Sequence, residues 1–510
     1  MRRELKIEDP WVYFSWVLII IFGLLQLLRS VILPQFMDIY YHLQVAWGFV
    51  RSGGYSGWDF WEYAPFGRPH IYPPFFHIIL ALLMKLGFSA IFLAKLFESA
   101  APVLFLIAIW YFIKKNYSAQ LAFFVVLAFS SAFAFFISLS NHVPAALALI
   151  FGLFSFNELF KNRCLRATIL LALCFYTHIG VSWFFLLAFI FYGLTDKGLR
   201  LQALKAVFFA LAAAAPLLIK QLQALPLLQA AGLDMQEKFL CQIKLIEYPL
   251  SILGVFFALK LSGRYRFFVS LFASSLVFLS YPYRFFSAEG YLPVIFLSAL
   301  AIQAIWNKLK ACAPLTRRLS CGLLIIFFLF VSPTLSLNKP GPSGKISYEL
   351  KWMDSAFCGM LFAKGSTIWL PREYASAVEA IRNNSSDKEI IYSNLNIVGP
   401  ILGSLAQRAT ANALLPEIGP ARTVPVLEAA GIIVLTRDLD EAAVKGLSAK
   451  YGWVKTGENK IFQVFKNPAA KYTVMVNKPA VSFPMIILIF ILAAGLFWAP
   501  ELAGKFKRKT

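Results

Sequence analysis

Apolar runs long enough to cross a bilayer recur along almost the whole chain. The first extends from residue 11 to about 33, and further runs that could span lie at about 90–113, 119–139, 143–160, 167–178, 180–194, 203–219, 247–261, 266–282, 289–306, 319–336 and 481–499. The pair at 167–178 and 180–194 is short. Because 59% of the 510 residues are hydrophobic and only 15% are charged, the chain is too apolar for a soluble globule. Since a helix needs roughly 20 apolar residues to cross the hydrocarbon core, the sequence predicts a polytopic α-helical membrane protein with about 12 transmembrane helices.

The distribution of Lys and Arg predicts the orientation of these helices. The stretch 74–87, PFFHIILALLMKLG, is short and is interrupted by His77 and Lys85, so we predict that it lies as a helix at the membrane interface. With that choice, basic segments such as YFIKKN, FKNRCLR and the tail KFKRKT all face the cytoplasm, as expected for short inner loops. We therefore predict an integral multi-pass protein with both termini in the cytoplasm, in the cell membrane if the source is prokaryotic. The net charge of +22 then faces anionic lipid, and no nucleic acid is expected as a partner.

One polar segment interrupts the apolar runs. After the linker SLNKPGPSGK, the stretches REYASAVEAIRNN and EAAVKGLSAKYG have helical spacing, whereas KEIIYS, GIIVLT and KIFQVFKN are typical of strands. This alternation predicts a small α/β domain. The expected organisation is a multi-span membrane domain over 1–337, an extracytoplasmic α/β domain over 338–480, and a final transmembrane helix with a basic cytoplasmic tail over 481–510.

The first external loop, residues 34–89, is rich in titratable and aromatic side chains. Asp38 and His42 stand four residues apart, which places both on one face of a helix. A carboxylate at this position can accept a proton from an attacking hydroxyl or hold a divalent cation. The alternative is that Asp38 caps the helix YYHLQVAWGFVRS and that the aromatic side chains form an interfacial belt. Composition alone leaves both interpretations open.

The order of motifs in this loop resembles a known family. The loop contains D-x-Y-Y-H-L, then a Gly-Gly turn, then W-D-F-W-E-Y-x-P-F-G-R-P and Y-P-P. This order is similar to the first external loop of the GT-C membrane glycosyltransferases, especially the catalytic subunit of oligosaccharyltransferase. YFIKKN followed by SLSNHVPA, the segment YPYRFFSAEGYLP and an α/β module outside the membrane resemble later features of the same family. The resemblance covers most of the chain in architecture and two short segments in residues.

The resemblance implies an enzyme that transfers a sugar or glycan from a polyprenyl-phosphate-linked donor to a protein or glycan acceptor on the extracytoplasmic side. It implies that Asp38 is the general base or a metal ligand and that Arg284 binds the lipid phosphate. Further substrate contacts are expected from a set of charged and imidazole side chains, namely Arg68, Lys85, His77, Asp59 and Glu62.

The resemblance also bears on the metal and the acceptor. The second outer motif of oligosaccharyltransferases is acidic, whereas here it is Asn141-His142. A site for Mn²⁺ or Mg²⁺ at Asp38 would therefore have either lost a ligand or replaced it with His142. The acceptor-reading motif W-W-D-Y-G is absent, and the segment 351–354, KWMD, stands in the expected region. This difference favours a monosaccharide or other glycan transferase over a reader of Asn-x-Ser/Thr acceptors.

Structural interpretations and two other functions stay open beside these predictions. Arg284 can anchor the interface beside Tyr281 and Tyr283, Lys85 can snorkel to the membrane surface, and His142 can end a helix. The chain could also be a transporter or flippase of a lipid-linked glycan, or a catalytically inactive GT-C scaffold. A transporter is expected to carry charges deep in several spans and symmetry between its halves. Here the charges gather near one face, which favours interfacial chemistry.

Overall fold

Helices occupy most of the chain. The computed structural model describes residues 9–30, 38–227, 241–308, 313–338, 347–362, 371–413 and 424–506. Residues 34–37 of the predicted first loop and 339–346 in and after the predicted linker lie outside these ranges. Over the described residues, the predicted apolar runs fall mainly on one helix or on consecutive helices, so the predicted α-helical class is confirmed. The end of the run 319–336 lies in the strand Thr334–Asn338, and the start of the run 481–499 lies in the strand Val481–Ser482.

The chain divides into two compact units. The helical unit consists of Met1–Ser30, Glu98–Ala215 and Asp234–Lys364. The loop unit consists of Val31–Phe97, Pro216–Leu233 and Gly365–Thr510. Two long helices, α4 (Ala90–Asn116) and α10 (Arg200–Ala224), contribute residues to both units.

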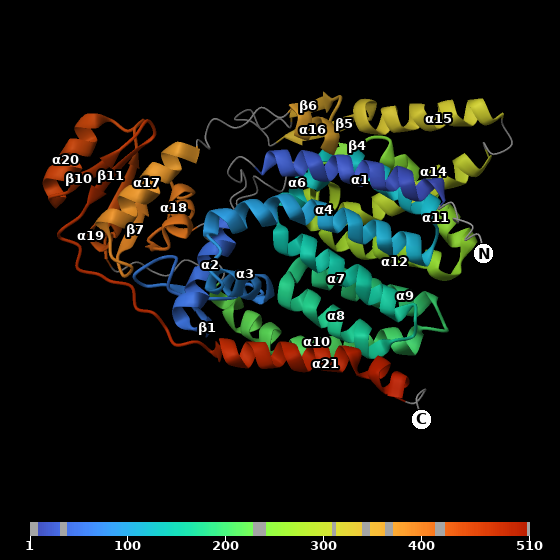
Figure 1. Ribbon diagram of the computed structural model, residues 1–510, viewed down its shortest axis with the longest axis horizontal. Helices are drawn as coiled ribbons and strands as arrows, with labels where there is room; N and C mark the ends of the chain where they lie inside the picture. The colour runs from blue at the N-terminus through green and yellow to red at the C-terminus, as the bar shows by residue number, and fades with distance from the viewer. Residues whose placement is uncertain are drawn as a thin grey trace, which may run out of the picture. The chain divides into compact units, whose positions relative to one another are not determined.

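The helical unit is built from apolar helices. They are α1 (Pro10–Arg29), α5 (Ala119–Ser131), α6 (Phe133–Asn141), α7 (Val143–Leu159), α8 (Cys164–Thr177), α9 (Ile179–Thr195), α11 (Glu247–Leu261), α12 (Arg266–Ser275), α13 (Pro282–Phe286), α14 (Leu292–Lys308), α15 (Pro314–Ile326) and α16 (Ala356–Phe362). Helices α7, α8 and α9 lie side by side (Figure 1). A Cβ on Gly152 would come within 2.1 Å of the Phe185 ring, and one on Gly254 within 2.0 Å of the Leu297 carbonyl oxygen. Glycine therefore permits these close helix approaches, as is usual in membranes.

Among the described residues, four helical segments are long and apolar enough to span a membrane. They are Pro10–Arg29, Ala90–Asn116, Arg200–Ala224 and Pro282–Lys308. Shorter apolar helices occupy Phe75–Lys85, Val143–Leu159, Cys164–Thr177, Ile179–Thr195, Leu319–Val331 and Phe483–Ala499. These helices identify an integral membrane protein, whereas the total of about 12 crossings and the placement of both termini stay predictions.

The apolar run 119–139 forms two helices with a sharp bend between them, where the sequence predicts one uninterrupted run. Helices α5 and α6 meet at Ala132 with a bend of 82°. Just before the bend, Ser130 Oγ donates to the Val126 carbonyl at 2.8 Å and Ser131 Oγ to the Ala128 carbonyl at 2.7 Å. Such back-bonding by serine competes with the helical backbone and favours a bend.

A three-stranded antiparallel sheet includes the start of the predicted linker. Its strands lie in the order β4 (Cys241–Lys244), β5 (Thr334–Asn338) and β6 (Ser347–Lys351). The first three residues of SLNKPGPSGK therefore belong to a strand, which corrects the linker prediction. Because β4 comes from a distant part of the chain, the local composition of this segment gives no sign of the pairing.

The loop unit contains the first external loop and the last helix. Helix α2 (Asp38–Ser52) is followed by short paired strands and by α3 (Phe75–Lys85), so the two helices predicted in this loop are present. Strand β1 (Gly54–Tyr55) pairs with β12 (Val481–Ser482), directly before α21 (Phe483–Phe506). Strand β2 (Trp58–Asp59) pairs with β3 (Arg68–Pro69). Over residues 38–89, the loop is therefore built from helices and hydrogen-bonded short strands.

The loop unit also contains a five-stranded mixed sheet in the order β10-β11-β9-β7-β8. Its strands are β7 (Ile390–Ser393), β8 (Ala409–Thr410), β9 (Ile432–Thr436), β10 (Val454–Glu458) and β11 (Phe462–Lys466). The helices around it are α17 (Pro371–Asn384), α18 (Val398–Ala406), α19 (Val426–Ala429) and α20 (Glu441–Tyr451) (Figure 1). Strand β9 is buried at every position, as expected for a central strand covered on both faces. The three strands and two helices predicted in this segment are present.

Candidate functional site

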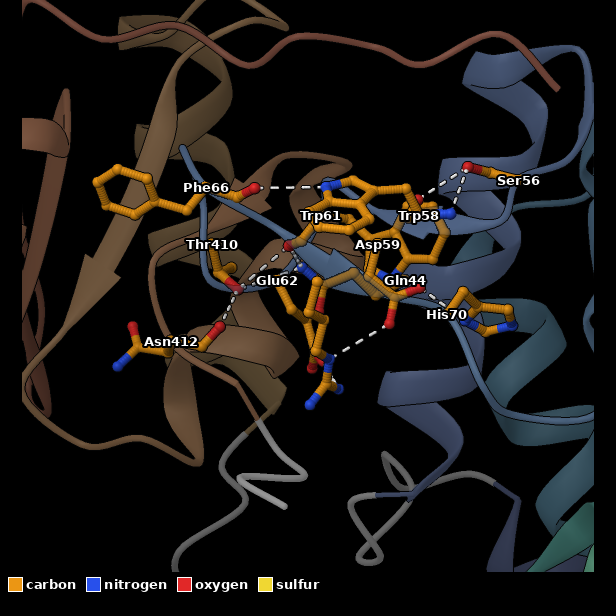
Figure 2. Close-up of polar contacts among 11 residues, drawn as sticks. Gln44, Ser56, Trp58, Asp59, Trp61, Glu62, Phe66, His70, Thr410 and Asn412 are labelled. Atoms are coloured by element: carbon orange, nitrogen blue, oxygen red, sulfur yellow. Dashed lines mark hydrogen bonds and ion pairs between the residues drawn. The ribbon is translucent and has the colours of Figure 1, made fainter. Parts of the chain in front are cut away.

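A hairpin in the first loop brings three predicted site residues together. Strands β2 and β3 place Asp59 directly opposite Arg68. Arg68 Nε donates to Asp59 Oδ2 at 3.3 Å, and another nitrogen of the same guanidinium pairs with Glu62. On the other side of Asp59, His70 Nδ1 lies 2.6 Å from Oδ1. Figure 2 shows Asp59, Glu62 and His70 gathered in this loop.

These four side chains are all buried, with 0 to 4% of each exposed. Burial opposes the positive charge of Arg68, but Glu62 and then Asp59 outweigh this effect and hold the pKa of the guanidinium above its ordinary value. Arg68 therefore stays charged and balances the two carboxylates. The charged groups of this cluster therefore face one another inside the loop. The substrate contacts predicted for Asp59, Glu62 and Arg68 stay predictions.

A pair of buried histidines lies beside this cluster. His42 Nδ1, from α2, is 2.8 Å from His77 Nε2, from α3. The rings of Tyr41, Tyr72 and His70 also pack against His77, with centroids 6.1, 5.3 and 5.7 Å away. Burial, and then the neighbouring His42 and His70, lower the pKa of His77 well below its ordinary value. His77 is therefore neutral in the folded protein and joins α2 to α3.

We expect the stability of the protein to fall as the pH drops below about 6.5, the ordinary pKa of histidine in an unfolded chain. Below that pH the unfolded state binds a proton that folded His77 does not accept, so unfolding becomes easier. Thermal unfolding in detergent between pH 8 and pH 5 measures this dependence. His77→Gln should weaken it relative to the unmodified protein. If both proteins lose the same stability between pH 8 and pH 5, a group other than His77 is responsible.

A second cluster of charged and aromatic side chains surrounds Arg284 in the helical unit. Arg284 belongs to α13, at the start of the helical segment Pro282–Lys308, where the sequence predicts entry into an outer loop. Arg284 Nη1 donates to Glu289 Oε1 at 2.8 Å, and His178 Nε2 lies 4.0 Å from the same oxygen. The guanidinium also lies over the Tyr281 ring, 5.5 Å from its centroid. Glu289 is buried, whereas 27% of the Arg284 side chain is exposed, so the guanidinium is oriented by Glu289 and partly exposed at the surface of the unit.

The remaining predicted residues lie at helix ends. Asp38 is the first residue of α2 and is half-buried. Lys85 is the last residue of α3, and its ammonium lies 4.5 Å from the centre of the Phe483 ring. His142 stands between α6 and α7, with its ring 6.5 Å from that of Tyr283, the neighbour of Arg284. Of the predicted residues, the structure therefore joins Asp59, Glu62 and Arg68 in one cluster and places His142 beside the segment of Arg284.

The predicted metal ligands belong to different units, Asp38 to the loop unit and His142 to the helical unit. Over the described ranges, no three side chains of His, Cys, Asp or Glu are close enough to form a metal site. A protein cage formed by such side chains is thus not part of the described structure. Mg²⁺ is commonly held by one or two carboxylates together with substrate phosphates, so the predicted metal stays a proposal centred on Asp38.

Sequence reasoning did not assign roles to several partners of these residues. Glu289 accepts from Arg284, His178 lies 4.0 Å from the same Glu289 oxygen, and His70 Nδ1 lies 2.6 Å from Asp59 Oδ1. In the helical unit, Arg29 pairs with Glu98 and donates to Ser140 Oγ at 3.3 Å. The proximity of Arg284 and Glu289 in the sequence was a usable signal, because a carboxylate five residues from a candidate phosphate ligand is well placed to orient it. The pairs Arg29–Glu98 and His178–Glu289 join distant segments and carry no local signal.

Solved structures resemble this chain, although no protein-family model and no curated protein matches its sequence. Oligosaccharyltransferase AglB from Archaeoglobus fulgidus, in complex with an inhibitory peptide and a dolichol-phosphate, superposes with a TM-score of 0.55 and 12% identity, over 89% of this chain and 74% of that one. Apo ArnT from Cupriavidus metallidurans superposes with a TM-score of 0.53 and 13% identity, over 89% of this chain and 98% of that one. Arabinofuranosyltransferase AftD from Mycobacteria superposes with a TM-score of 0.52 and 12% identity, over 89% of this chain and 41% of that one. At this identity the likeness concerns the fold, and this chain is an integral membrane protein with the GT-C glycosyltransferase fold, similar to that of oligosaccharyltransferase AglB.

Proposed function

We propose that this chain is a glycosyltransferase that transfers a sugar or glycan from a polyprenyl-phosphate-linked donor to an acceptor on the extracytoplasmic side of the membrane. The observation that carries the proposal is the likeness of fold, over 89% of the chain, to AglB and to ArnT. AglB is described in complex with a dolichol-phosphate and ArnT bound to undecaprenyl phosphate. The acceptor is proposed to be a protein or another glycan.

The proposed chemistry uses two of the predicted residues. The acceptor oxygen or nitrogen forms a bond to the anomeric carbon while the bond from that carbon to the phosphate oxygen breaks, and the phosphate leaves with the electron pair. The acceptor proton passes to the Asp38 carboxylate, which acts as the general base. Arg284 binds the phosphate and stabilises the negative charge that develops on it, since preformed charged donors act most strongly where charge appears. Glu289, at 2.8 Å, orients the Arg284 guanidinium for this contact.

The remaining predicted residues are proposed to support this chemistry. Lys85 lies at the end of α3 and would supply a second cation near the membrane surface. His77, Asp59, Glu62 and Arg68 would maintain the shape of the loop that carries Asp38. Mn²⁺ or Mg²⁺, if bound by Asp38, would neutralise phosphate charge, and His142 is the further ligand proposed for it. We further propose about 12 crossings, with both termini cytoplasmic and the α/β domain outside.

The experiment that tests the function is transfer of radiolabelled sugar from a mixed polyprenyl-phosphate donor pool. Purified protein is reconstituted in lipid and assayed with a glycan and a peptide acceptor, with and without Mn²⁺ or Mg²⁺. Label that leaves the lipid fraction and joins either acceptor supports a glycosyltransferase. Label that crosses the bilayer while still attached to the lipid would identify a flippase. No movement of label with any donor would support an inactive scaffold.

Arg284→Ala is expected to raise the KM for the lipid donor by about 10- to 100-fold, because a hydrogen bond between charged groups contributes ~1.5–3 kcal/mol and each 1.4 kcal/mol is tenfold. Initial rates against donor concentration measure the change. Glu289→Gln should give a smaller rise, since Arg284 then loses only its orienting carboxylate. Arg437→Ala is the matched control, because Arg437 lies in the α/β domain and pairs with Glu458 on its surface. An unchanged KM in Arg284→Ala would leave Arg284 as an interfacial anchor.

A further inference from the structure

The first loop extends the edge of the five-stranded sheet. Strand β8 is the last strand in the order β10-β11-β9-β7-β8, and residues 61–64 lie along it. Three backbone hydrogen bonds join them: Thr410 N donates to Trp61 O at 2.9 Å, Ala64 N to Thr410 O at 3.0 Å, and Tyr63 N to Asn412 O at 3.4 Å. The loop thus pairs with backbone groups that an edge strand would otherwise leave open. The pairing fixes the register of the loop against the sheet.

A buried side chain connects helix α2 to the same place. Gln44 Nε2 donates to Trp61 O at 2.8 Å and lies 3.3 Å from Thr410 Oγ1. Both side chains are fully buried. Figure 2 shows Gln44, Trp61 and Thr410 converging. Because a buried polar group is costly unless it is hydrogen-bonded, these contacts favour one placement of α2 on the sheet.

Tight packing restricts this placement further. A Cβ on Gly48 of α2 would come within 2.0 Å of the Trp61 ring. A Cβ on Gly403 of α18 would come within 2.9 Å of Gln44 Nε2 and 2.4 Å of Thr410 Cγ2. Glycine at these two positions therefore permits the close approach of α2 to the Trp61 ring and of α18 to Gln44 and Thr410.

We propose that Gln44 and Thr410 are positioning residues, through which the α/β domain sets the placement of α2 and of the Asp38 carboxylate. The role in catalysis rests on the proposed function. Neither side chain touches the reacting atoms in this proposal. Their effect is on geometry, and a displacement of ~1 Å at a reacting group can lower the rate by up to ~100-fold.

The test compares Gln44→Leu, Thr410→Val and the double variant in the transfer assay. Each single variant should lower kcat by ~10-fold or more at an unchanged KM for the donor. The double variant should lose less activity than the product of the two single losses, because both substitutions remove the Gln44–Thr410 hydrogen bond while each also removes a bond of its own, Gln44 to Trp61 O and Thr410 to Asn412 O. Thr410→Ser keeps the hydroxyl and should restore kcat. The matched control is Thr436→Val, whose hydroxyl accepts from Asn394 Nδ2 at 2.8 Å at the end of β9, which β7 separates from β8 in the same sheet.

Hydrogen exchange of the α2 amides separates a failure of this inference from a failure of the proposed function. Faster exchange along α2 in Gln44→Leu and Thr410→Val, and not in Thr436→Val, supports the connection whether or not the protein transfers sugar. Unchanged exchange in both variants would overturn it. In an active enzyme, an unchanged kcat, additive losses or a raised KM would also overturn the positioning role. If the unmodified protein shows no transfer activity, the proposed function is refuted. Hydrogen exchange of the α2 amides would then still show whether Gln44 and Thr410 hold α2 against the sheet.

Discussion

Asp38→Asn should lower the transfer rate by about 10²–10⁴-fold, the range expected when a general base is removed. Asparagine has nearly the same size and can start a helix as well as aspartate can, so α2 should form normally. What the variant loses is the ability to accept the proton of the attacking acceptor. Rates at saturating donor and acceptor, with matched amounts of folded protein judged by gel filtration, measure the change.

Asp440→Asn is the matched control for this experiment. Asp440 caps α20 in the α/β domain, and its carboxylate accepts from the backbone amides of Ala442 and Ala443. Asparagine can accept the same bonds, so transfer should not change. If Asp38→Asn keeps most of the activity while the unmodified enzyme is active, the base must be another group. The alternative interpretation of Asp38, as a residue that only begins α2, would then hold.

The helices could be predicted from the sequence because burial in a membrane leaves a local signal. Continuous apolar runs mark α1, α4 and α7, and alternation of helical and strand patterns marks α17 and β9. The break between α5 and α6 has a weaker signal, since Ser130 and Ser131 occur in an otherwise apolar run and their effect depends on where each hydroxyl points. The pairing of β4 with β5 has no local signal at all, because it joins distant segments.

The types of residue in the candidate site could be predicted from the sequence more readily than the contacts between them. Acids and cations in the first loop are visible in the sequence, and so is Arg284 between aromatic residues. The sequence does not show that Arg68 turns inward to Asp59 and Glu62, since this depends on the register of a two-stranded hairpin. It likewise does not show that Thr410 meets Gln44, because the two belong to segments with no shared pattern. Long-range packing decides which charged residues are available to a substrate.

Arg68→Met should destabilise the protein by about 3–5 kcal/mol, the usual cost of leaving buried charges without their partner. Asp59 and Glu62 are 2% and 0% exposed, and Arg68 is the guanidinium that pairs with both. Methionine fills a similar volume but cannot balance two carboxylates. Thermal unfolding in lipid nanodiscs, with the fraction of folded protein read by gel filtration, measures the loss. Arg51→Met is the matched control, because Arg51 forms a partly exposed ion pair with Asp387 and such pairs contribute at most ~1 kcal/mol.

A compensated variant distinguishes a structural role of Arg68 from a role in binding the donor. Combining Arg68→Met with Asp59→Asn and Glu62→Gln removes the whole charge cluster, and replacing a complete buried ion pair is often neutral for stability. Stability should therefore return in the triple variant. If transfer activity returns with stability, the role of Arg68 is structural and it does not bind the donor. If stability returns and transfer does not, then at least one of the three charges acts on the substrate as well. If the single variant is as stable as the unmodified protein, the buried cluster does not stabilise the loop.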